Sequence, residues 1–133
     1  MSMPAGWLLA TAAAGGGAIG ALLRHLVNQV LVHRPGGGLP LATWLVNIAG
    51  CFLAGLLLIW VDGRGVSAPF WRALLITGLL GGLTTFSAFG LELWQWLRAE
   101  RYGFAIAVIG AHVVVGVAAV AAGWRLGRAI WPA

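Results

Sequence analysis

Residues 73–91 read ALLITGLLGGLTTFSAFGL and contain no charged side chain. The run is long enough to cross the hydrocarbon of a bilayer as a helix, which takes about 20 residues. Its centre, residues 81–89, combines two adjacent glycines with two threonines and a serine. Glycine weakens a helix, and a membrane tolerates interrupted backbone only where that backbone lines a cavity or binds something. We therefore expect a broken membrane helix here, and the functional centre of the protein.

The composition places the whole chain in a lipid bilayer. Of its 133 residues, 61% are hydrophobic and 8% are charged, whereas a soluble domain has about 25% charged residues. A separate catalytic domain has no room, and the sequence shows no nucleophile–base pair or metal-ligand cluster, so we expect no enzyme. All basic residues are arginines, dispersed near expected helix ends. This distribution suits lipid headgroups rather than nucleic acid.

Charged residues divide the chain into four apolar stretches. We expect an all-α membrane protein, a single domain over residues 1–133, with four transmembrane helices near 5–31, 41–61, 70–98 and 103–128. The first connection, HRPGGGLP at 33–40, is rich in proline and glycine and predicts a turn.

Small residues recur at a spacing of four in all four expected helices. The pairs are Gly16 and Gly20, Gly50 and Ala54, Gly78 and Gly82, and Gly123 and Gly127. Such pairs let helix backbones approach closely. A pore of adequate perimeter forms more easily between copies of so small a bundle than inside one copy. We therefore expect an oligomer, in particular a dimer.

The arginines give almost no bias for orientation in the membrane. With four helices, one side would carry Arg64, Arg72, Arg125 and Arg128, and the other Arg34, Arg98 and Arg101, with Arg24 towards the end of the first helix. Orientation follows the excess of Arg and Lys in short loops. Because the two sides carry nearly equal numbers of arginines, insertion in both orientations, with antiparallel pairing, is favoured over a single orientation.

Polar residues inside the expected helices each have two interpretations. Asn47 either joins two helices through hydrogen bonds or lines a pore, where its amide N–H can donate to an anion. Thr84, Thr85 and Ser87 either bond back to their own helix or line the same pore.

Four further residues are ambiguous in the same way. Phe86 and Phe89 lie three apart, hence on similar faces of a helix, which alone is typical of packing. Glu92 lies near the end of its span, where it either pairs with an arginine or serves as a proton-coupling carboxylate. His112, in the middle of the fourth helix, has no second ligand at metal-binding spacing. It is either a packed core residue or a polar pore residue.

Three segments resemble the Fluc (CrcB-type) fluoride channels of bacteria. They are GGAIGALLR at 16–24, TWLVNIAG at 43–50 and GLLGGLTTFSAFGLE at 78–92. With the length and the four-helix layout, the resemblance covers essentially the whole chain. It implies a channel in the bacterial inner membrane that exports fluoride passively. It also implies an antiparallel, dual-topology homodimer with two fluoride pathways.

The resemblance implies roles for individual residues. The family's pore asparagine falls on Asn47, and its pore-facing phenylalanines fall on Phe86 and Phe89. We expect Thr85, Ser87 and His112 to line the pore beside them. A structural sodium ion at the dimer interface would be held by the backbone carbonyls of Gly81 and Thr84 from both subunits. One departure stands out: the family often places serines along helix four beside the pore, and those positions fall here on His112 and Gly116.

Two other classes of function remain open at this point. A small proton-coupled exporter, like the four-helix multidrug transporters, needs a membrane-embedded carboxylate in a cavity, and Glu92 is the candidate for it. A scaffold subunit without transport would explain the small-residue pairs, but not Asn47 or the segment 81–89.

Overall fold

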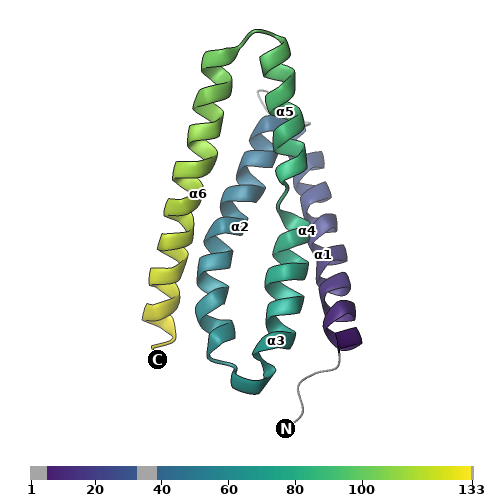
Figure 1. Cartoon of the computed structure of the whole chain (residues 1–133), viewed down its shortest axis with the longest axis vertical. Helices are drawn as coiled ribbons and strands as arrows, with labels where there is room; N and C mark the ends of the chain where they lie inside the picture. The colour runs from purple at the N-terminus through teal and green to yellow at the C-terminus, as the bar shows by residue number, and fades with distance from the viewer. Residues whose placement is uncertain (1–5, 33–38, 133) are drawn as a thin grey trace.

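The computed structural model describes residues 6–32 and 39–132, and the regular structure in these residues is helical. Helix α1 spans Gly6–Val32 and α2 spans Leu39–Asp62. The third segment is a succession of short elements: η1 (Gly65–Ser67), α3 (Ala68–Trp71), η2 (Arg72–Leu80), α4 (Gly81–Leu83) and α5 (Phe86–Arg98). Helix α6, Tyr102–Ile130, completes the bundle (Figure 1).

Four helical segments in the described residues are long and apolar enough to cross a membrane. They are Gly6–Leu31, Pro40–Asp62, Gly65–Arg98 and Tyr102–Ile130. The expectation of an all-α protein with four such helices is confirmed. The third segment begins earlier than expected because Pro69 lies in the first turn of α3, where its missing N–H costs no helix bond. The turn expected over 33–40 lies largely outside the described residues.

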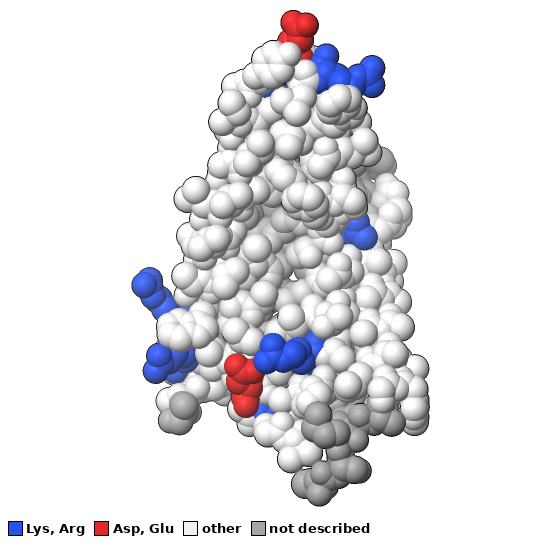
Figure 2. Space-filling model, in the orientation of Figure 1, with Lys and Arg blue, Asp and Glu red and all other residues white. Residues whose placement is uncertain are grey.

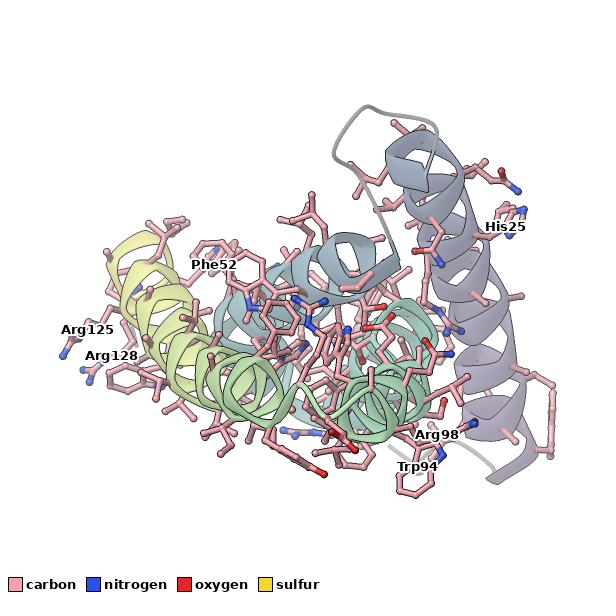
Figure 3. The ribbon with its side chains drawn as sticks, turned by 90° about the horizontal axis from the view of Figure 1, so that it is seen from above. His25, Phe52, Trp94, Arg98, Arg125 and Arg128 are labelled. Carbon is pink, nitrogen blue, oxygen red and sulfur yellow. The ribbon has the colours of Figure 1, made fainter. Side chains whose placement is uncertain are left out.

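The helices pack in two main pairs. Helix α1 packs along η2 and α4, and α2 packs along α6. Seen from above, α1 and α6 form the two flanks, with α2 and α5 between them (Figure 3). Charged groups gather mainly towards the two ends of the molecule, with a largely uncharged surface between them (Figure 2). This is the distribution expected for a bundle whose middle lies in hydrocarbon.

Both pairs of helices approach through glycine. A methyl group on Gly20 would overlap the carbonyl of Leu79, and one on Gly82 would overlap the carbonyl of Gly17. The same kind of backbone overlap would follow at Gly16, Gly55, Gly78 and Gly123. Most of the small-residue pairs therefore face helices of the same chain. They explain the packing of this bundle, and the expected dimer gains no support from them.

We expect Gly20→Ala to destabilise the protein by about 1–3 kcal/mol, the usual cost of overpacking. The added methyl meets rigid backbone of η2 and α4, so α1 must shift away. Gly15→Ala is the matched control, because a methyl there meets nothing within 4 Å. Thermal unfolding in detergent should show a lower Tm for Gly20→Ala alone. Equal Tm values for the two variants would contradict this close contact.

Candidate functional site

Helix α4 ends at Leu83 and α5 begins at Phe86, and the two residues between them are extended. Thr84 has φ −84° and ψ 160°, and Thr85 has φ −154° and ψ 119°. Gly81 and Gly82, the glycines whose low helix propensity led us to expect a break within residues 81–89, are themselves helical. An interruption at these glycines is therefore a wrong expectation, because the extended residues of the segment are the two threonines. The β-branched threonines suit extended backbone, whereas the missing side chain of Gly82 is needed for close contact with α1.

Asn47 on α2 pairs with the backbone of this extended segment. Its Nδ2 donates to the carbonyl of Thr85 at 3.0 Å, and its Oδ1 accepts from the N–H of Thr85 at 2.8 Å. Both backbone groups of Thr85 are thereby satisfied, which matters where no water replaces a lost helix bond. Asn47 therefore does join two helices. An amide has two N–H hydrogens, and this bond to the carbonyl uses one of them.

The two threonine hydroxyls bond locally. The Thr84 hydroxyl donates to the carbonyl of Leu80 at 2.8 Å, so it bonds back to its own helix. The Thr85 hydroxyl accepts from the N–H of Ala88 at 3.1 Å and so caps α5. The Ser87 hydroxyl lies 3.2 Å from that of Thr85. The interruption is therefore built to start a new helix, whose N-terminus carries partial positive charge.

These bonds leave two carbonyls without their helical donors. In a continuous helix, the N–H of Thr85 would bond the carbonyl of Gly81, but it bonds Asn47 instead. Likewise, the N–H of Ala88 would bond the carbonyl of Thr84, but it bonds the Thr85 hydroxyl. Gly81 and Thr84 are the residues expected to hold sodium. In the part of the chain that the structure describes, no cluster of three His, Cys, Asp or Glu side chains offers a metal site.

Arg24 is a participant that our sequence reasoning did not assign to this site. Its Nε donates to the carbonyl of Gly82 at 3.1 Å, next to the carbonyl of Gly81. The signal in the sequence was an arginine inside an otherwise apolar span. Such a residue usually faces the bundle interior and bonds backbone carbonyls.

A cavity of about 480 Å³ collects most of the expected site residues. Its lining includes Asn47 from α2, Phe86 and Phe89 from α5, and His112 from α6, together with Gly81, Thr84 and Thr85. Ser87 is not among the lining residues. Cys51, one turn beyond Asn47 on α2, also lines the cavity. Residues far apart in the sequence thus meet around one space beside the extended segment.

The rings of Phe86, Phe89 and His112 contact one another in a row in this cavity. The ring centroids of Phe86 and Phe89 are 5.8 Å apart, and those of Phe89 and His112 are 4.2 Å apart. Phe89 is 8% exposed, whereas Phe86 is 82% exposed. The packing interpretation therefore fits Phe89 but not Phe86. The ring of Phe86 therefore faces lipid or a second protein surface rather than the interior of its own chain.

His112 has one engaged nitrogen and one free nitrogen. Its Nδ1 lies 3.0 Å from the carbonyl of Val108. Because a carbonyl only accepts, Nδ1 carries the proton of this bond. Nε2 is buried and has no partner among the described residues. His112 is thus held in a fixed orientation, with its ring packed against that of Phe89.

Glu92 lies in a different cavity. It is 8% exposed, and its Oε1 accepts from the Thr43 hydroxyl at 2.5 Å. Its Oε2 is buried without a partner among the described residues. This cavity, of about 320 Å³, is also lined by Asn28 and Trp96. Among the described residues, Glu92 therefore bonds a threonine rather than an arginine, and it does not line the cavity of Asn47 and Phe89.

The chain matches known proteins over most of its length. Residues 11–124 match the family described as "CrcB-like protein, Camphor Resistance (CrcB)". Several curated relatives carry the name "Fluoride-specific ion channel FluC". The one from Xanthomonas euvesicatoria is 41% identical over 128 residues, 96% of either chain. The one from Xylella fastidiosa strain M23 is 45% identical over 115 residues, 84% of either chain. The one from Caulobacter vibrioides is 40% identical over 119 residues, 89% of this chain and 94% of the relative.

Proposed function

Because the chain belongs to the CrcB family, in which curated relatives are fluoride-specific ion channels, we propose that it is a fluoride-selective channel. Fluoride would leave the cytoplasm passively, down its electrochemical gradient. The observation that carries the proposal is the cavity in which Asn47 and Thr85 meet the rings of Phe86 and Phe89. The four membrane-spanning helices make this a multi-pass membrane protein, and the bacterial relatives suggest the inner membrane.

The cavity has the groups that a fluoride pathway needs. Fluoride is small and strongly hydrated, so a narrow pore must replace its water by well-placed donors. The second amide hydrogen of Asn47 and the hydroxyl of Thr85 can donate. The edge of a phenyl ring is electropositive, so Phe86 and Phe89 can face an anion edge-on. His112 offers fluoride no hydrogen-bond donor, because its Nδ1–H is directed at the carbonyl of Val108 and Nε2 carries a lone pair.

Glu92 supports a second candidate, a proton-coupled exporter. Its buried carboxyl group has one oxygen bonded to Thr43 and one without a described partner. An intramembrane carboxyl group in a cavity is what proton coupling requires. The cavity of Glu92 is not the one that holds Asn47 and Phe89, however. This separation favours the channel over the exporter.

Fluoride efflux from liposomes separates the two functions. With the membrane potential held at zero by potassium and valinomycin, purified protein should release fluoride down its gradient at a rate that a protonophore leaves unchanged, with far less release of chloride. A channel needs no other gradient, so we expect the same initial rate at equal and unequal pH across the membrane. Fluoride movement that requires an opposing proton gradient would support the exporter.

The working unit in our proposal is an antiparallel, dual-topology homodimer. Phe86 is 82% exposed although it lines the cavity, and Val113, also in the lining, is 60% exposed. A pore with so much of its wall uncovered needs a second wall. A second copy can supply that wall, and the even arginine balance favours its opposite orientation. The extended residues Thr84 and Thr85 would then lie within the membrane, between the two ends of the third span.

A structural sodium ion at the dimer interface follows from the two freed carbonyls. The carbonyls of Gly81 and Thr84 have lost their helical donors to Asn47 and to the Thr85 hydroxyl. Carbonyls that face hydrocarbon instead of water need a partner. Neutral oxygens without a carboxylate suit a monovalent cation better than calcium. The ion would hold the two extended segments together rather than move with fluoride.

We expect preparation without sodium, in a large organic cation such as N-methyl-D-glucamine, to reduce both flux and dimer stability. The preparation must be sodium-free from the start, because exchange of a buried ion can be slow. Adding sodium back to the same sample should restore both properties, whereas adding lithium or more organic cation serves as the control. Undiminished flux and an equally stable dimer without sodium would contradict the proposed ion.

A further inference from the structure

A basic and aromatic cavity lies at the end of the bundle where α2 and α6 finish, away from the cavity of Asn47. It has a volume of about 570 Å³, and its lining includes Trp60, Arg64, Trp124, Arg128 and Trp131. Asp62 ends α2 and Ile130 ends α6. Helix ends that carry tryptophan and arginine lie at the membrane–water interface. The cavity is therefore at the level of lipid headgroups.

Two guanidinium groups in this cavity have no carboxylate partner among the described residues. Arg64 lies over the ring of Trp60, 3.7 Å from its centroid, and Arg128 lies 5.0 Å from the centroid of Trp124. The acidic residue of the lining, Asp62, is bonded at 2.6 Å to Arg72 instead. Arg128 lies on the outer side of α6, next to Arg125 (Figure 3). Stacking on tryptophan holds a guanidinium in place and leaves its N–H groups free to bind an anion.

An apolar cavity adjoins the basic one. Its volume is about 440 Å³, and Trp124 lines both. The rest of its lining is mostly aliphatic, including Leu58, Ile76, Val117 and Val120. A small hydrated anion gains nothing from such a surface. A molecule with a charged head and a hydrocarbon chain fits both cavities at once.

We propose that this end of the bundle binds an anionic phospholipid. The headgroup phosphate would lie between Arg64 and Arg128, and one acyl chain would run into the apolar cavity beyond Trp124. Guanidinium groups bind phosphate through paired N–H donors, and basic pockets between transmembrane helices recognise anionic headgroups. The headgroup cavity shares no lining residue with the cavity of Asn47, whereas the apolar cavity shares Ala54, Ile76 and Val120 with it, so the acyl chain would lie beside the fluoride pathway.

Native mass spectrometry of the purified full chain tests the site with phosphatidylglycerol and phosphatidylcholine as probes. An arginine near the membrane surface contributes about a factor of five in affinity for anionic lipid. Arg64→Gln should therefore weaken phosphatidylglycerol binding about fivefold, and Arg64→Gln with Arg128→Gln about thirtyfold. Phosphatidylcholine should bind weakly to all forms. Arg64→Lys keeps the charge but loses the paired donors, and should give an intermediate affinity.

Arg101→Gln is the matched control. Arg101 also stacks on an aromatic ring, 4.7 Å from the centroid of Phe104, but it lies at the turn between α5 and α6, at the opposite end of the bundle (Figure 1). It should leave phosphatidylglycerol affinity unchanged. An equal loss for Arg101→Gln, equally tight phosphatidylcholine, or displacement by millimolar inorganic phosphate would each overturn the lipid site. Because the readout is lipid binding, the result is independent of fluoride transport.

Discussion

Phe86→Ile should lower fluoride flux by at least about tenfold while leaving the protein folded. We take the attraction between an electropositive ring edge and fluoride in a dry pore to equal that of a desolvated cation–π contact, about 2 kcal/mol. Losing this attraction raises the barrier by the same amount and slows passage roughly thirtyfold. Isoleucine keeps the residue apolar and of similar bulk, so what is lost is the ring. Because Phe86 is 82% exposed in its own chain, the substitution should cost the monomer little stability.

Phe89→Ile should lower flux in the same way, but with a stability cost. Phe89 is buried and stacked on His112, and an imperfect swap in a packed position costs up to about 1.5 kcal/mol. Flux must therefore be measured per correctly folded dimer. Phe104→Ile is the control, since Phe104 packs on Trp96, away from the cavity. Normal flux in both Phe86→Ile and Phe89→Ile would show that the two rings serve ordinary packing rather than fluoride passage.

Two variants locked in opposite orientations should be inactive alone and active together. The near-even arginines leave insertion almost unbiased, so two added lysines should fix it. The structure offers sites for both directions. Gly63 and Val66 lie in the turn after α2, and Ala99 and Gly103 lie around the turn between α5 and α6. All four residues are exposed and therefore tolerate a longer side chain. Val66, for example, is 48% exposed, and a Cβ on Gly103 meets nothing within 4 Å.

Fluoride flux after separate and joint expression of these two lysine variants gives the result. Each alone should show only background flux, because no antiparallel partner exists, and co-expression should restore flux close to that of the unmodified chain. Replacing the same residues by glutamine controls for the substitutions themselves, since glutamine carries no orientation signal. Full flux from either lysine variant alone would rule out an obligate antiparallel dimer.

Much of the fold follows from the sequence by simple physical rules. The apolar runs between charged residues gave the four spans, because a helix needs about 20 such residues to cross hydrocarbon. The glycine pairs correctly indicated close helix packing. Their partners could not be deduced, because spacing along one helix does not say which helix lies opposite. Gly20 and Gly82 proved to connect α1 with the third segment of the same chain.

The interruption in the third segment shows where sequence reasoning reached its limit. The polar cluster at 81–89 was the right place to look, but glycine was the wrong residue to choose. The extended backbone falls on Thr84 and Thr85 because Asn47, distant in the sequence, binds the backbone of Thr85 from α2. Arg24, bonded to Gly82, was missed for the same reason. Both are contacts between segments, which local propensity cannot supply.

The ion selectivity of single channels in a planar bilayer tests the central claim most directly. With fluoride on one side and chloride at the same concentration on the other, a channel that prefers fluoride at least a hundredfold should reverse beyond roughly 120 mV, since each tenfold preference gives about 59 mV. Fluoride should carry this current with no pH difference across the bilayer. A reversal potential near zero, or fluoride movement without any current, would contradict a fluoride-selective channel.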